Sequence, residues 1–289
     1  MKALSFNIPI TDDESFIVRK DAKEYFYATF HSHKEIQITL ILESDGSVCI
    51  GDYIGRYSKN DLFIIGSNCP HVFKNDPAYE EVDFDINPRA VSVYLGEYFW
   101  DEKKFTIPEL SNIQKFHKKS KQVYHTNLSE DEELVNSIMA LASEKGLQKY
   151  LSLISILDRL TALQKCHFLL ENPFENHLDE EEGNRLKRVY EYTLVNSDQK
   201  ISIQKVADIA NLSPNAFCRF FKKGTGKTYA DFLKSVRINN SAKLLISTDK
   251  SVSQIAEISG YHNISNFNRQ FLKLKSETPL QYRKRNQET

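Results

Sequence analysis

The sequence predicts an α+β protein of two domains: an N-terminal β-barrel with a helical segment, and a C-terminal all-α domain with two helix-turn-helix motifs. Two observations lead to this prediction. Short aromatic and β-branched runs, separated by turn signals, fill residues 25–90. The last hundred or so residues contain one helical pattern twice, which indicates an internal repeat. A chain of 289 residues is long enough for two domains of ordinary size.

The charge is divided unevenly between these two parts. Residues 183–289 hold 19 Lys and Arg against 8 Asp and Glu, whereas the rest of the chain holds 19 against 31. A basic domain joined to an acidic one suggests that only the basic domain meets a polyanion. No apolar run is long enough to span a bilayer, and the first residues do not resemble a signal peptide. The four cysteines lack metal-ligand or redox spacing, so we expect reduced thiols in a cytoplasmic protein.

The clearest strand of the N-terminal part runs from Phe30 to Ile38. Its period of two places polar side chains on one face and apolar ones on the other. Further strands are predicted over 47–50, 62–65 and 72–74, each next to a turn signal. The polar face of the first strand and a histidine beside the last one make a candidate binding cluster of five residues: His31, His33, Glu35, Gln37 and His71.

Residues 25–90 resemble the cupin barrel. The resemblance lies in three short stretches: His31-x-His33, Asn60-Asp61-Leu62 where the family usually has Gly-Asp-Leu, and Pro70-His71 with Asn75. In metal-binding cupins the implied ligands are the two histidines of the first motif, a later histidine, and a Glu four residues after the second histidine. That last position holds Gln37 here. A neutral amide is a poor partner for a divalent cation, so we expect no metal and no cofactor.

The five-residue cluster is instead expected to hydrogen-bond a small polar ligand, for example a sugar. It belongs to a predicted sensing domain over residues 1–125. The alternative is a polar cluster that binds nothing.

A helical segment is predicted over residues 126–170, with Ser129 as a helix N-cap. Between Leu147 and Leu170 apolar residues recur at helical spacing: Leu151, Ile154, Leu157, Leu160 and Leu163. Such a stripe packs either into the core of its own domain or against a second subunit in a two-fold dimer. The acidic stretch 171–183 is predicted to be a linker.

The repeat lies in the C-terminal domain, residues 184–289. The segment Val206-Ala207-Asp208-Ile209 matches Ile255-Ala256-Glu257-Ile258 at an offset of 49, and 217–221 matches 267–271 at an offset of 50. The second copy therefore has one extra residue between its two helices. Each copy predicts two short helices joined by a tight turn, which is a helix-turn-helix. Ser202, Ser213 and Ser251 are the predicted N-caps.

Residues 184–285 are similar to the AraC/XylS family of bacterial transcription regulators. In the first copy the match rests on Ala207 and Ile209, Phe217-x-Arg219-x-Phe221-Lys222-Lys223-x-x-Gly226, and Leu233, Arg237, Ala242 and Leu244-Leu245. In the second copy it rests on Ile255-Ala256, Gly260-Tyr261, Phe267-x-Arg269-x-Phe271 and Thr278-Pro279-x-x-Tyr282-Arg283. Ser276 stands where the family usually has Gly. The resemblance implies a DNA-binding domain behind a ligand-sensing domain.

The outward residues of each second helix can enter the major groove. Arg219 and Arg269 occupy equivalent places and are the main candidates for guanine or phosphate contact. The other residues expected to enter the groove are Asn215, Cys218, Lys222, Ile264, Ser265 and Asn268, and Ser213 is a further expected DNA-binding residue. Lysines and one arginine are expected to contact phosphates: Lys222, Lys223, Lys227, Arg237 and Lys273. The helix between the motifs should set the two readers roughly 34 Å apart, one turn of DNA.

The sequence thus predicts a transcription factor without enzymatic activity. Its expected partners are double-stranded DNA, a second copy in a homodimer, a small-molecule effector, and RNA polymerase if it activates; no membrane is involved. Two alternatives stay open: a regulator whose barrel only dimerises, and a metal-dependent cupin enzyme joined to a DNA-binding domain.

Overall fold

The computed structural model describes residues 14–21, 31–51, 53–76, 90–100, 107–163, 166–170 and 180–287. The chain divides into two compact units, Met1–Leu178 and Asp179–Thr289, and each is described by itself. Most of the predicted linker, residues 171–179, lies outside the described residues. Its last four residues are helical, because α4 begins at Glu180 rather than at residue 184.

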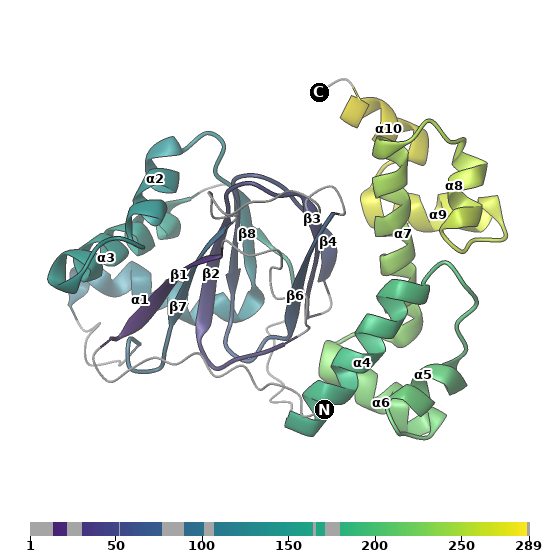
Figure 1. The fold of residues 1–289 in the computed structure, drawn as a ribbon, viewed down its shortest axis with the longest axis horizontal. Coiled ribbons are helices and arrows are strands. Elements are labelled where there is room, and N and C mark those ends of the chain that lie inside the picture. The colour runs from purple at the N-terminus through teal and green to yellow at the C-terminus, as the bar shows by residue number, and fades with distance from the viewer. Residues whose placement is uncertain are drawn as a thin grey trace. The chain divides into compact units, whose positions relative to one another are not determined.

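The N-terminal unit contains two antiparallel sheets (Figure 1). The larger sheet has six strands in the order β1 (Phe16–Asp21), β7 (Ala90–Leu95), β2 (Ile36–Ile41), β5 (Asp61–Ile65), β8 (Tyr124–Asn127) and β9 (His167–Phe168). The smaller sheet has the order β4 (Tyr53–Tyr57), β3 (Gly46–Ile50) and β6 (His71–Asn75). Among the described residues, the sheets share no ladder, and a single bridge joins His31 to His71 of β6. The predicted barrel is therefore barrel-like but not closed.

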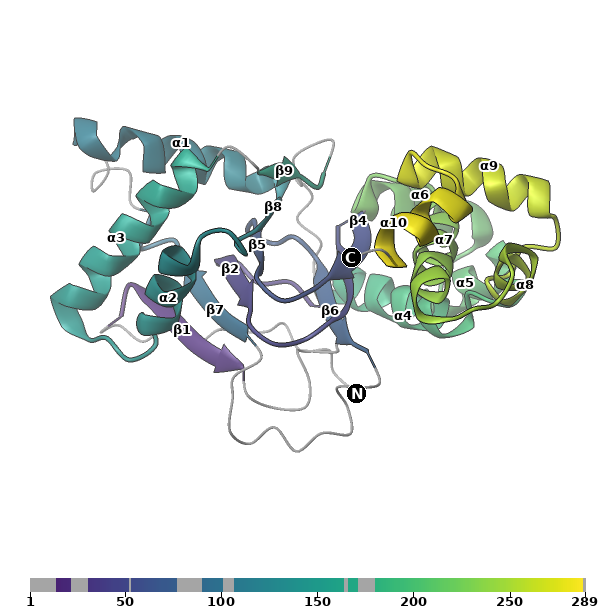
Figure 2. The same cartoon turned by 90° about the horizontal axis from the view of Figure 1, so that it is seen from above.

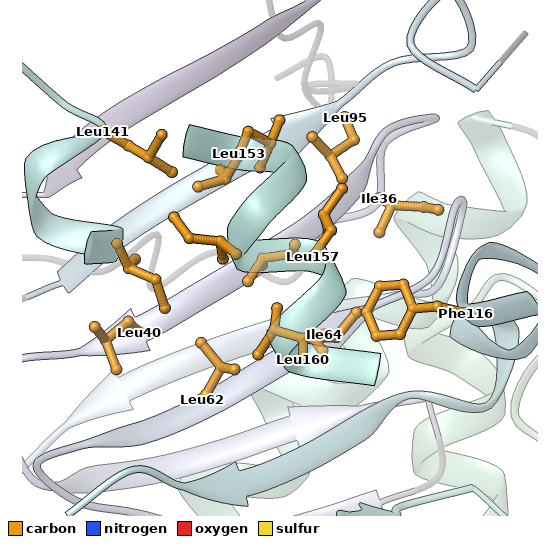
Figure 3. Packing of buried hydrophobic residues seen from close by; sticks show 14 of the residues in the cluster. Ile36, Leu40, Leu62, Ile64, Leu95, Phe116, Leu141, Leu153, Leu157 and Leu160 are labelled. Carbon is orange, nitrogen blue, oxygen red and sulfur yellow. The ribbon is translucent and has the colours of Figure 1, made fainter. Parts of the chain in front are cut away.

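Both faces of the larger sheet are buried. Its first face carries alternate residues of β2, such as Ile36, Ile38 and Leu40, which pack under helices α1 (Ser111–Lys119), α2 (Glu132–Ala140) and α3 (Gly146–Ala162). Figure 2 shows these helices on one side of the sheet, and Figure 3 shows Leu153, Leu157 and Leu160 of α3 against side chains of β2 and β5. The second face contributes to a smaller cluster with β3, β4 and β6. The residues of β2 between the apolar ones, Gln37 and Thr39, belong to this second face.

The helical segment follows the prediction in part. Two 3₁₀ turns flank α1, at Pro108–Leu110 and Ser120–Gln122. Helix α2 is capped by the side chain of Asp131, which accepts from the Leu134 N–H, and not by Ser129. Helix α3 ends at Ala162, and β9 follows where the sequence predicted helix as far as Leu170. The apolar stripe divides, because Leu157 and Leu160 are buried in the core while Leu151 is 52% exposed.

The C-terminal unit is entirely helical in its described part, as the sequence predicted. Its helices are α4 (Glu180–Asn196), α5 (Ile203–Ile209), α6 (Pro214–Thr225), α7 (Tyr229–Ser247), α8 (Val252–Ile258), α9 (Ile264–Lys275) and α10 (Pro279–Gln287). The predicted caps are present: Ser202 begins α5, Ser213 begins α6 and Ser251 begins α8. Helix α7 lies between the pair α5–α6 and the pair α8–α9 (Figure 1). No helix in the described residues has the length and apolar character that crossing a membrane requires.

Candidate nucleic-acid interface and buried histidine cluster

Each helix-turn-helix motif is built around a pair of buried phenylalanines on its second helix. Phe217 and Phe221 of α6 are completely buried, and so are Phe267 and Phe271 of α9. In the first motif they contact the rings of α4 and α7, while in the second they join the cluster around α7 and α8. Because the two phenylalanines of each helix lie one turn apart, they fix one face inward and leave the opposite face to solvent.

The turn of each motif needs a left-handed residue. Asn211 supplies it in the first motif with φ 53°, and Gly260 supplies it in the second with φ 82°. A Cβ on Gly260 would lie 2.9 Å from the carbonyl oxygens of Ser197 and Asp198 and from Nε of Arg237. Glycine is therefore required at residue 260 by contact as well as by conformation, whereas asparagine tolerates the equivalent position.

Helix α6 presents the expected polar residues on its outer face. Asn215, Cys218, Arg219, Lys222 and Lys223 are all exposed. The hydroxyl of Ser213 caps the helix, because it accepts a hydrogen bond from the Ala216 N–H. Lys227, just beyond the other end of α6, is half-buried. Lys223 is 61% exposed but lies 3.4 Å from the carboxylate of Glu182 in α4, so part of its charge is compensated within the unit.

Helix α9 presents a less basic face. Ile264, Ser265, Asn268, Arg269 and Lys273 are exposed, as expected. Arg269 donates to the Asn266 side chain at 3.1 Å, and this bond orients the guanidinium along the helix surface. The sequence reasoning did not single out Leu272, which occupies the place of Lys222 and is 49% exposed. The period of the buried phenylalanines could have indicated it, since Leu272 directly follows Phe271.

Arg237, for which a phosphate contact was predicted, is bonded within the fold. Its guanidinium donates to the carbonyl oxygens of Ser197 and Gln199, both at 2.7 Å. Arg283 of α10 does the same for the second motif, because it donates to the carbonyl oxygens of Leu245, Thr248 and Lys250. In each case an arginine from a following helix holds the loop that leads into the first helix of a motif. These donors are committed to backbone oxygens.

In the N-terminal unit, the structure brings together four of the five predicted ligand-binding residues. The coordinating atoms of His31, His33 and His71 lie within 4.8 Å of one another. Oε1 of Gln37 is 2.9 Å from Nε2 of both His33 and His71. Glu35 lies behind this cluster, with its carboxylate 3.5 Å from Nδ1 of His33.

The ionisation of this cluster follows from its burial. Desolvation lowers the pKa of His33, and it holds the pKa of His71 well below its usual value, helped by the neighbouring His31 and His33. Desolvation raises the pKa of Glu35. Burial therefore favours the neutral imidazoles of His33 and His71, and the neutral form is the one that binds a metal or accepts a hydrogen bond.

The donor set fits a divalent transition-metal ion better than the sequence suggested. Nδ1 of His33 faces the Glu35 carbonyl oxygen at 3.0 Å, and Nδ1 of His71 faces the Cys69 carbonyl oxygen at 2.8 Å. A carbonyl oxygen only accepts, so each Nδ1 carries the proton and each Nε2 presents a lone pair to the cluster centre. Histidines that bind metals are commonly held in this way. Two imidazole nitrogens and an amide oxygen thus converge, with His31 beside them.

A surface cavity of about 430 Å³ lies elsewhere on this unit, between the ends of β2 and α2. Glu43, Lys59, Glu132 and Met139 are among its lining residues, and none of the five cluster residues is. The predicted ligand-binding residues therefore lie in the packed interior between the sheets and not in this cavity.

Residues 206–285 match the family model of a helix-turn-helix domain. The chain is 24% identical over 281 residues to an uncharacterised HTH-type transcriptional regulator, YdeC of Bacillus subtilis, covering 90% of this chain and 87% of that protein. It is 34% identical over 93 residues to the melibiose operon regulatory protein of Escherichia coli, and this match covers 32% of this chain and 31% of that protein. A solved structure, the C-terminal domain of AraT, a response regulator from Geobacillus stearothermophilus, is 30% identical, with 35% of this chain and 84% of that chain covered and a TM-score of 0.33. On the motif residues and the family match, the C-terminal unit of this chain is an AraC-type helix-turn-helix DNA-binding domain.

Proposed function

We propose that this chain is a cytoplasmic transcriptional regulator that reads two successive major grooves of double-stranded DNA with α6 and α9. The observation that carries this proposal is the exposure of Arg219 and Arg269 at equivalent places in a repeated motif whose phenylalanines are completely buried. Arginine pairs with guanine or with phosphate by two parallel donors, so it suits either contact.

The other exposed residues have complementary roles in this proposal. Asn215 and Cys218 of α6, and Ile264, Ser265 and Asn268 of α9, face base edges. The lysines Lys222, Lys223, Lys227 and Lys273 neutralise phosphates, which positions the domain without specifying sequence. Ser213 contributes through the helix N-terminus that it caps.

The test is the binding of the full chain to its own upstream DNA, measured by fluorescence anisotropy across salt with random DNA as competitor. Arg219→Ala and Arg269→Ala should each lose about 1–3 kcal/mol on the specific site. Lys118→Ala removes an exposed charge of α1 in the other unit and should bind like the parent. Failure of the parent chain to bind at any salt would refute the proposal.

The N-terminal unit is proposed to sense a small polar effector through His31, His33, Glu35, Gln37 and His71. A sugar is one possibility, and the similarity to a melibiose operon regulatory protein supports including sugars in the first screen. Effector binding would alter the placement or release of the two readers. An effector present at 100 times its dissociation constant should stabilise the chain by about 2.7 kcal/mol in thermal unfolding. His71→Ala should abolish that stabilisation, whereas His167→Ala, at an exposed histidine, should keep it. A screen of sugars, small acids and metals without any stabilising compound would favour a domain that only dimerises.

A homodimer through α3 is part of the proposal. Leu147 and Leu151 lie one turn apart and are 72% and 52% exposed, and Met139 of α2 is 38% exposed. Burying such side chains against a second copy is favourable, by about 25 cal/mol for each Å² of apolar surface. Leu151→Glu should therefore shift the sedimentation of the chain from dimer to monomer, and Lys118→Glu on α1 should not. An unchanged sedimentation coefficient for Leu151→Glu would place the interface elsewhere.

A further inference from the structure

A chain of buried polar side chains connects the histidine cluster to a carboxylate on another strand. Gln37 Nε2 lies 2.6 Å from Thr39 Oγ1, Thr39 Oγ1 lies 3.0 Å from Ser92 Oγ, and Ser92 Oγ lies 2.9 Å from Asp21 Oδ2. The path crosses three adjacent strands, from β2 through β7 to β1, because Thr39 pairs with Ser92 in the register of β2 and β7. Gln37, Thr39 and Ser92 are each at most 5% exposed.

The donors and acceptors along this chain admit two arrangements. In the first, Gln37 Oε1 faces the two Nε2 atoms and its amide donates to Thr39, which donates to Ser92, which donates to Asp21. The chain then ends on an ionised carboxylate. However, the Nδ1 atoms of His33 and His71 carry the imidazole protons, so each Nε2 has a lone pair. These two lone pairs then face a lone pair of Gln37 Oε1, with no proton between them. This arrangement is therefore stable only with a cation among those lone pairs.

In the second arrangement every hydrogen bond is reversed. A half-turn of the Gln37 amide directs its two N–H groups at Nε2 of His33 and of His71, which satisfies both lone pairs. Its oxygen then accepts from Thr39, Thr39 accepts from Ser92, and Ser92 accepts from Asp21. The carboxyl of Asp21 must carry a proton to donate. No cation is needed, and all these groups are paired.

We propose that the histidine cluster binds a divalent transition-metal cation, and that Asp21 supplies the compensating negative charge through Gln37, Thr39 and Ser92. Binding converts the second arrangement into the first. One cation enters, the amide and the two hydroxyls rotate, and the proton of Asp21 leaves to solvent, so one proton is released for each cation bound. The absence of a carboxylate at residue 37 is thus offset by the carboxylate of Asp21, which is the third side chain beyond Gln37 in this chain of hydrogen bonds.

The surroundings of Asp21 favour its protonated form more than solvent would. Burial raises the pKa of Asp21, against the hydrogen bond from Ser92 and the nearby charge of Arg19, which lower it. Arg19 is the charged residue that acts on Asp21 within the described residues, and it lies on the same strand. Its own side chain lies over the Tyr94 ring, 5.6 Å from the centroid. The charge of Arg19 therefore limits the rise in the pKa of Asp21.

This proposal rests on the sensor site proposed above but not on DNA binding, so the two are measured separately. The probe is Co²⁺, titrated into the full chain by calorimetry at pH values from 5.5 to 8, in pairs of buffers with different heats of ionisation. The difference between buffers counts the protons released. We expect binding to be lost in His33→Ala, and the parent to release up to one proton more than Asp21→Asn. The parent's affinity should accordingly rise up to tenfold more per pH unit than that of the variant.

Two further variants make the test specific to the chain of side chains. Ser92→Ala keeps the carboxylate but breaks the path, and it should lose the extra proton like Asp21→Asn. Glu97→Gln removes an exposed carboxylate of the same unit and should behave like the parent. Protons from Glu35 are common to all of these variants and cancel in the differences. Far-UV circular dichroism checks that each variant is folded. If Asp21→Asn does not fold, the comparison of the parent with Ser92→Ala decides the outcome.

Equal proton release by the parent and Ser92→Ala would overturn the relay, because the charge would then act through space. Absence of Co²⁺ binding, or binding that survives His33→Ala, would overturn the cation site. Anisotropy of the same samples on DNA tells these failures from a failure of the regulator itself.

Discussion

The two motifs end their second helices in the same left-handed conformation but with different residues. Gly226 closes α6 with φ 80°, and Ser276 closes α9 with φ 59°. Both donate a backbone N–H at 2.9 Å to the residue four positions earlier, Lys222 or Leu272. A non-glycine residue in this region costs about 1–2 kcal/mol, and glycine costs about 0.5–1 kcal/mol of extra chain entropy on folding. Ser276→Gly should therefore stabilise the C-terminal unit by roughly 0.5–1 kcal/mol.

The reverse change at the equivalent cap, Gly226→Ser, should destabilise by a similar amount, and Ser253→Gly inside α8 should destabilise by up to about 1 kcal/mol. Thermal unfolding of the full chain, followed at 222 nm, reports mainly on the C-terminal unit, because most of the helical residues lie there. About 1 kcal/mol shifts the midpoint of a domain this size by several degrees. Fluorescence of Trp100, the single tryptophan, reports the other unit and should not move. A lower midpoint for Ser276→Gly would refute the reasoning, since it would mean that the serine stabilises the cap by a contact stronger than its strain.

Other changes separate fold from recognition. Arg237→Ala should cost about 2 kcal/mol of stability, because it leaves two backbone acceptors without their charged donor, and Arg237→Lys should not restore it. The same variant, corrected for folding, should keep the salt dependence of DNA binding, whereas Lys222→Ala should reduce the slope by about 1. Gly260→Ala should cost more than 1 kcal/mol in chemical unfolding, since its Cβ would meet two carbonyl oxygens at 2.9 Å. Asp131→Ala should cost about 1 kcal/mol by uncapping α2, and Ser129→Ala should be nearly neutral.

Local signals in the sequence predicted local structure well. Ser202, Ser213 and Ser251 cap helices as predicted, since a cap depends on three or four consecutive residues. The same rule was wrong at Ser129, because Asp131 nearby competes for the helix N-terminus and accepts from Arg159 as well. The helix predicted to reach Leu170 failed for a tertiary reason. Residues 167–168 pair with β8 at the sheet edge, and apolar periodicity does not contain that pairing.

The binding cluster shows where the sequence stops being informative. A period of two places Thr39 on the face of Gln37, so the first step of the polar chain could have been predicted. Ser92 and Asp21 could not, because their positions depend on the register between β2, β7 and β1, which are far apart in the sequence. The prediction that no metal binds was based on the neutral amide of Gln37 alone, without the side chains that lie behind it. The structure supplies three more groups behind that amide.

Arg237 shows that the charge of a basic domain is not all available to DNA. Net charge counts every cation as available to DNA, but the fold itself uses some of them. Arg237 and Arg283 hold backbone carbonyl oxygens, and Lys275 donates to the Asn239 side chain. Removing Arg237 leaves six of the predicted cations for DNA: Arg219, Lys222, Lys223, Lys227, Arg269 and Lys273. If all six contact phosphates, the log–log salt slope is about −5, which is far smaller in magnitude than the excess of positive charge on residues 183–289 would suggest. We therefore expect the footprint on DNA to depend on which cations the helix packing leaves accessible, and three of these six lie on α6.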